Sequence, residues 1–180
     1  LLKVLERGGK ISGKVANLVR DLGNILKAQG RYDDAETLIR AAIDIFEKSG
    51  TPPDSFPLMT TRFILAHTLM AQEDWQGAIK TLELSRQGNQ AAYDQKFGDR
   101  PFMGQALLYS GRTDEALGII SPMYDRVEKR LGVKHIETAK LGISLAVALT
   151  AADKKEAALG HFAKAVPILT NRSRQSDDDS

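Results

Sequence analysis

The feature that most constrains this chain is a small-residue skeleton that recurs with a period near 40 residues. Each copy contains a Leu or Met followed directly by Gly or Ala. Another alanine, which we call the landmark alanine, lies further toward the C-terminus of each copy. The landmark alanines lie 43, 38 and 42 residues apart. A period of this size is typical of stacked helical repeats, in which each repeat is one supersecondary unit. The copies begin at Leu22, Leu65, Met103 and Leu145, and their alanines are Ala35, Ala78, Ala116 and Ala158.

Each copy predicts two antiparallel helices. In the first copy, apolar residues around Leu22 have helical spacing and Gly30 follows as a stop signal. A second apolar stripe runs from Tyr32 to Phe46 in steps of three and four residues, and the turn between the two is short. The small residues allow the paired helices to approach to about 8–10 Å. We therefore expect an all-α fold, a right-handed superhelix (α-solenoid) of about four helix-turn-helix repeats.

The repeat boundaries follow from the same pattern. Residues 1–170 form the predicted array, and the polar end, residues 171–180, is predicted to be a disordered acidic tail. Residues 88–101 between the second and third repeats fit either a loop or a short extra helix. An amphipathic stub at the start and the polar end suggest a piece of a longer protein. The predicted repeats are residues 15–48, 56–88, 98–131 and 138–170, with a repeat remnant at 1–10.

Composition excludes several classes of function. The chain has no cysteine, so disulfides, thiolate metal sites and cysteine nucleophiles are absent from it. Its net charge is +2, and the basic residues form no block of the kind that nucleic-acid binders carry. No apolar run reaches the ~18 residues that span a membrane. These features favour a cytoplasmic protein that binds neither nucleic acid nor membrane.

No catalytic, metal or cofactor site is predicted. Residues Gly8–Val15 have the glycine and lysine spacing of a phosphate-binding loop, but Val15 stands where a Ser or Thr would hold magnesium. The three histidines fall in different repeats, so no pair has metal-ligand spacing. The aspartates at 177–179 lack the looped spacing of a calcium site. We therefore expect no enzyme activity within this chain.

The skeleton resembles the tetratricopeptide repeat. The ordinary repeat has a period of about 34 residues, and the longer spacing here is similar to the kinesin-light-chain-like subtype of about 42 residues. The linker Leu131–Ala139, LGVKHIETA, is like the linker of that subtype, except that Ile136 stands where proline is usual. The first copy matches at Leu22, Gly23, Leu26, Gly30, Tyr32, Ala35 and Ala42, and the fourth at Leu145, Ala146, Leu149, Ala158, Phe162 and Ala165.

The resemblance implies a binding groove. In this family the first helix of each pair lines the concave face, which receives a protein or peptide segment. The groove would be polar and basic at one end and apolar at the other, which suits a segment with an acidic end. The positions carried over are Asn17, Arg20, Asn24, Lys27, Phe63, His67, Met70, Gln105, Leu108, Tyr109, Lys140 and Val147.

Three functional classes remain open from the sequence. The first is a free-standing protein-interaction scaffold. The second is a regulatory array that controls an attached catalytic domain, since the ending AVPILTNRSRQSDDD resembles the last repeat before a caspase-like CHAT peptidase domain in bacterial proteins. The third is self-association through the open ends of the array. The full reading frame of the gene would separate the first two.

Overall fold

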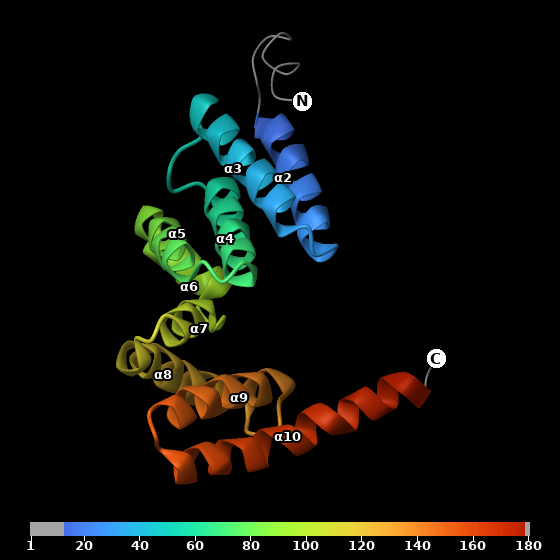
Figure 1. Ribbon diagram of the computed structural model, residues 1–180, viewed down its shortest axis with the longest axis vertical. Helices are drawn as coiled ribbons and strands as arrows, with labels where there is room; N and C mark the ends of the chain where they lie inside the picture. The colour runs from blue at the N-terminus through green and yellow to red at the C-terminus, as the bar shows by residue number, and fades with distance from the viewer. Residues whose placement is uncertain (1–12, 179–180) are drawn as a thin grey trace. The chain divides into compact units, whose positions relative to one another are not determined.

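A computed structural model of the chain describes residues 13–178, with side chains to residue 170. All regular secondary structure in this described part is α-helical, as the sequence predicts (Figure 1). The predicted repeat remnant at residues 1–10 lies outside the described residues. The helices are α2 (Gly13–Ala28), α3 (Tyr32–Lys48), α4 (Phe56–Ala71), α5 (Trp75–Gly88), α6 (Gln90–Phe97), α7 (Phe102–Tyr109), α8 (Thr113–Leu131), α9 (Ile136–Ala151) and α10 (Lys155–Asp178).

The chain divides into two compact units, with the division between Phe97 and Gly98. In the first unit, α2 pairs with α3, α4 pairs with α5, and α3 also packs against α4. In the second unit, α7 pairs with α8, α9 pairs with α10, and α8 packs against α9. Each unit thus contains two consecutive helix pairs joined through the second helix of one pair and the first helix of the next.

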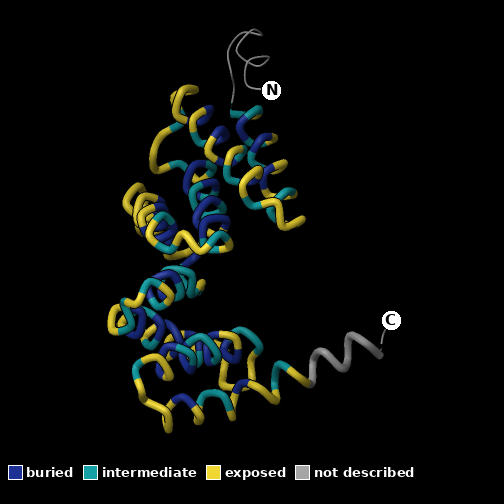
Figure 2. Tube along the Cα trace, viewed as in Figure 1, coloured by how far each residue is buried: buried dark blue, intermediate teal, exposed yellow. Residues whose placement is uncertain are grey.

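The landmark alanines lie where the paired helices cross. Ala35, Ala78 and Ala116 have no exposed surface, and Ala158 is 2% exposed. Buried residues gather on the sides of the helices that face their partners, while the outer sides are exposed (Figure 2). The recurring skeleton is therefore the contact surface of each helix pair.

The four turns within the helix pairs share one backbone conformation. Gly30 and Gly111 have φ angles of 77° and 83°. Glu73 and Asp153 occupy the matching positions and adopt φ angles of 62° and 57°, although a left-handed conformation costs a non-glycine residue roughly 1–2 kcal/mol. In each turn the amide after this residue donates to a carbonyl near the end of the first helix, as Asp74 does to Leu69 over 2.9 Å. The helix pairing thus imposes the turn even where glycine is missing.

The segment between the second and third repeats forms the short extra helix, α6, rather than a loop. The helical structure is interrupted at Gly98–Pro101. Helix α7 follows, with Pro101 as its N-cap residue. Proline disfavours the helical conformation of the residue before it, here Arg100, which explains the break. Helix α7 therefore spans only Phe102–Tyr109, whereas α2, α4 and α9 are 16 residues each.

The C-terminal helix differs from the predicted boundary. The sequence predicts that the array ends at residue 170 and that a disordered tail follows, but the backbone of α10 continues as a helix to Asp178. The physical reason is that no glycine or proline follows Pro167 to stop the helix. Residues 179–180 lie outside the described residues.

Candidate interaction surface

In the first unit, two predicted groove residues from consecutive first helices meet. Lys27 of α2 lies with its Nζ 3.2 Å from Nδ1 of His67 on α4. Desolvation lowers the pKa of His67, and the charge of Lys27 lowers it further. Desolvation also lowers the pKa of Lys27. The Lys27 ammonium therefore donates a hydrogen bond to a neutral His67, and the pair is one polar contact on this surface.

We expect NMR titration to show that His67 protonates below its ordinary pKa of 6.5. Lys27→Met should raise this pKa, but not fully to 6.5, because desolvation is the larger cause. Since the folded pKa is lowered, the unfolded state binds more protons below about pH 6.5. The contribution of His67 to stability is thus complete above that pH and falls as the pH drops. An unchanged His67 pKa in Lys27→Met would refute the effect of the Lys27 charge on His67. The His67 resonance is assigned by its absence from the spectrum of His67→Gln.

The basic character expected along α2 is weaker than the sequence suggests. The Arg20 guanidinium donates from Nη2 to Oδ1 of its neighbour Asp21 over 2.8 Å, and the Arg20 side chain is only 18% exposed. This ion pair offsets the charge of Arg20. Asn17 is half-buried and Asn24 is exposed on the same helix. Of the two predicted basic residues on α2, Arg20 is paired with an acidic residue of the same helix. For Lys27 the described residues of α2 show no such ion pair.

Phe63 is placed differently from the prediction. Its ring stacks on Phe97 of α6, with centroids 3.8 Å apart and planes at 12°. Tyr93 of α6 approaches the Phe63 ring edge-on at 6.5 Å. Together with the buried Met59, these rings form an apolar cluster inside the first unit. Phe63 therefore packs against α6 and is only partly exposed.

The second unit contains a cleft of about 310 Å³. Two predicted residues line it, Gln105 of α7 and Lys140 of α9. The Gln105 side-chain amide donates to Oγ of Ser144 over 3.3 Å and so links the two first helices. The remaining lining residues are Asp99, Arg100, Pro101, Phe102, Glu137, Leu141, Ile143, Ser144 and Leu169.

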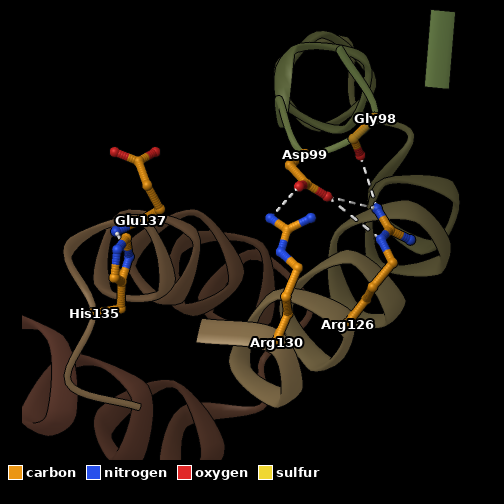
Figure 3. A network of polar contacts seen from close by, with 6 residues as sticks. All are labelled: Gly98, Asp99, Arg126, Arg130, His135 and Glu137. Atoms are coloured by element: carbon orange, nitrogen blue, oxygen red, sulfur yellow. Dashed lines mark hydrogen bonds and ion pairs between the residues drawn. The ribbon is translucent and has the colours of Figure 1, made fainter. Parts of the chain in front are cut away.

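One edge of the cleft is held by an arginine pair from α8 (Figure 3). Asp99 accepts hydrogen bonds from Arg126 and Arg130, and Arg126 also donates to the Gly98 carbonyl over 2.8 Å. Burial acts to raise the pKa of Asp99, but the hydrogen bonds and charges of the two arginines outweigh it and hold that pKa below its usual range. These contacts anchor the segment before α7, which positions Arg100 beside the cleft.

The first turn of α9 also lines the cleft. His135 is the N-cap residue, and its Nδ1 accepts a hydrogen bond from the Glu137 amide over 3.1 Å (Figure 3). Lys140 donates to the Glu137 carboxylate over 2.9 Å. This hydrogen bond lowers the pKa of Glu137 despite partial desolvation, and the charges of Lys140 and Arg100 add to the effect. Glu137 is thus ionised at neutral pH and lies in a basic environment.

The predicted residues separate into two sets, one on each unit. Met70, Leu108 and Val147 are half-buried, and Tyr109 is 58% exposed. The prediction missed Ser144, although it lies one helical turn after Lys140 and that spacing could have found it. It also missed Arg100 and Phe102, because they lie in or next to the segment whose helices the sequence left ambiguous.

The described residues contain no cluster of three or more His, Asp or Glu side chains that could hold a metal ion. No helix among them has the length and apolar character needed to cross a membrane.

Comparison with known proteins supports the family resemblance. Residues 15–49 match the tetratricopeptide repeat family model. No curated protein matches the sequence. One similar solved structure is that of a putative kinesin light chain from Podosopora anserina with nearly identical TPR-like repeats, in a single-substitution variant. It has 17% sequence identity to this chain and a TM-score of 0.78, and the match covers 94% of this chain and 81% of that one.

Two further solved structures agree. The corresponding Podosopora anserina repeats without that substitution have 16% identity and a TM-score of 0.75, covering 94% of this chain and 82% of that one. BtubC (BKLC) from P. vanneervenii has 16% identity and a TM-score of 0.67, covering 88% of this chain and 64% of that one. The chain thus carries a tetratricopeptide repeat at residues 15–49 and has the fold of kinesin-light-chain tetratricopeptide-like repeats.

Proposed function

We propose that this chain is a protein-interaction scaffold that binds a peptide or protein segment along the faces of its first helices. The observation that carries the proposal is the cleft of the second unit, which is lined by α7 and α9. Gln105 and Lys140, chosen from the sequence as groove residues, both line it. A concave site with apolar walls and a few convergent polar groups is the usual form of a binding site.

The chemistry of the cleft suits a partner segment with an acidic group beside an apolar one. Phe102, Leu141 and Leu169 supply apolar surface. The basic side chains at its edges outnumber the acidic ones, because both Arg126 and Arg130 neutralise the single carboxylate of Asp99. Arg100 and Lys140 add positive charge, against which only Glu137 is set. An acidic group would therefore gain favourable electrostatic contacts here.

Charge reversal tests this proposal. Peptides selected from a random-sequence display library against the full chain serve as probes, and their affinity is measured by fluorescence polarisation. Lys140→Glu is expected to weaken binding of acidic peptides by about tenfold, a cost near 1.4 kcal/mol. Binding should also weaken as salt rises, because charges at an exposed site are screened over about 8 Å at physiological ionic strength.

The matched control is Lys80→Glu, the same change at an exposed position on α5, a second helix. It should leave affinity within about twofold of the parent protein, a difference below 0.5 kcal/mol. Lys27→Glu tests whether the surface of the first unit also contributes. If Lys140→Glu and Lys80→Glu weaken binding equally, or neither does, the partner binds elsewhere on the chain and the cleft is not the site.

A further inference from the structure

The cleft of the second unit contains a carboxylate of its own next to one of its basic residues. Glu137 and Lys140 both line the cleft. The Lys140 Nζ lies 2.9 Å from Oε1 of Glu137, and the two side chains are 59% and 47% exposed. The Glu137 carboxylate projects from the first turn of α9 (Figure 3). Lys140 therefore already holds a negatively charged group from its own helix.

The second basic residue of the cleft acts on the same carboxylate. Arg100 lines the cleft and is exposed. The hydrogen bond from Lys140 is the largest cause that lowers the pKa of Glu137, and the charge of Arg100 adds to it. Asp99, the other acidic residue of the cleft, is held instead by two arginines of α8. Glu137 is thus the carboxylate that the basic residues lining the cleft stabilise.

An acidic residue in a first turn, paired with a basic residue three positions away, is an ordinary feature of helices. Glu115 has both properties in α8, where its carboxylate lies 2.7 Å from Nη2 of Arg112. The two pairs differ in their location. Both residues of the Glu137 pair line the cleft, whereas Glu115 and Arg112 do not. An acidic group that reaches Lys140 therefore meets a carboxylate that is already bound there.

We propose that Glu137 competes with the acidic group of a partner segment for Lys140, and so limits the affinity of the cleft for acidic segments. This inference rests on the function proposed above, because it assumes that an acidic group binds in this cleft. The incoming group must displace Glu137 from Lys140 or bind beside its negative charge, and like charges repel. Displacement is feasible because the ion pair is exposed, and exposed ion pairs are weak. Glu137 therefore reduces the affinity for acidic segments without abolishing binding.

The test uses the full chain and the acidic peptides selected for it, each compared with a version whose acidic side chains are replaced by amides. Glu137→Gln removes the charge and keeps the shape of the side chain. It is expected to raise the affinity for acidic peptides by about three- to fivefold, measured by fluorescence polarisation. The gain should disappear at high salt, because the charges are exposed and screened. The amide versions should bind both proteins with affinities within about twofold.

Glu115→Gln is the matched control, because it also removes a first-turn carboxylate that is paired with a basic residue of its own helix. It changes the net charge by the same amount and should leave the affinity within about twofold of the parent. An equal gain in Glu115→Gln, or an equal gain for the amide peptides, would overturn the competition.

The Lys140→Glu variant separates failure of this inference from failure of the proposed function. If Lys140→Glu weakens binding while Glu137→Gln leaves it unchanged or weakens it, the competition is refuted and the cleft remains the binding site. Glu137 would then only orient Lys140. If neither variant changes the affinity, the cleft is not the site, and the proposed function and this inference both fail.

Discussion

Replacing Phe46 by alanine is expected to lower the free energy of unfolding by about 3–5 kcal/mol, the cost typical of truncating a buried phenylalanine. Phe46 is 2% exposed and belongs to a core cluster that includes Ala16 and Val19 from α2 and Leu58 from α4. Its ring therefore joins the first helix pair to the first helix of the second. The loss should appear as a lower urea midpoint, measured by far-UV circular dichroism.

Phe56→Ala is the matched control, with the same atoms removed at a surface position. Phe56 is 52% exposed, and its described contact is with the Lys96 ammonium, 5.5 Å from the ring centroid. An exposed contact of this kind contributes about 0.5–1 kcal/mol, so the control should lose no more than that. Similar losses in the two variants would mean that Phe46 does not hold consecutive helix pairs together.

Replacing Gly104 by alanine is expected to destabilise the second unit by up to about 2 kcal/mol, measured by the same urea unfolding. A Cβ on Gly104 would lie 2.8 Å from Cδ1 of Ile120, and closer still to its Cγ1. Overpacking of this kind costs about 1–3 kcal/mol, which exceeds the gain of about 1 kcal/mol in helix propensity.

Gly118→Ala provides the control with the opposite sign. A Cβ at Gly118 would meet no atom within 4 Å, so this variant should be more stable by up to about 1 kcal/mol. Ile120→Leu should restore much of the stability of Gly104→Ala, because another pair has Ala66 and Leu82 at the equivalent positions. If Gly104→Ala is as stable as Gly118→Ala, the crossing is not closely packed.

The sequence explains only in part which small residue stands at each crossing of two paired helices. The sequence shows that small residues occupy these positions, with Gly23 and Gly104 in two pairs and Ala66 and Ala146 in the others. It does not explain the choice between glycine and alanine. The structure does, because a Cβ on Gly23 would lie 2.8 Å from Cγ1 of Ile39, as Gly104 meets Ile120. The side chain of isoleucine, which branches at Cβ, fills the space that the methyl group of an alanine would need.

The candidate surface was predicted only in part. Lys27 and His67, and likewise Gln105 and Lys140, come together because consecutive first helices are neighbours, which the repeat pattern implies. Phe63 does not join them, because α6 lies over its ring. The charge of Arg20 is offset by Asp21, a neighbour whose geometry depends on the rotamer and not on the pattern.

The sequence by itself determined the helix pairs and their turns, because apolar spacing and small residues act locally and recur in every copy. Only the tertiary structure decided the position of α6 and the cleft beside Arg100. These features depend on contacts between residues far apart in the chain, such as Asp99 with Arg126 and Arg130. Such contacts occur once and not in every repeat, so a periodic pattern in the sequence does not predict them.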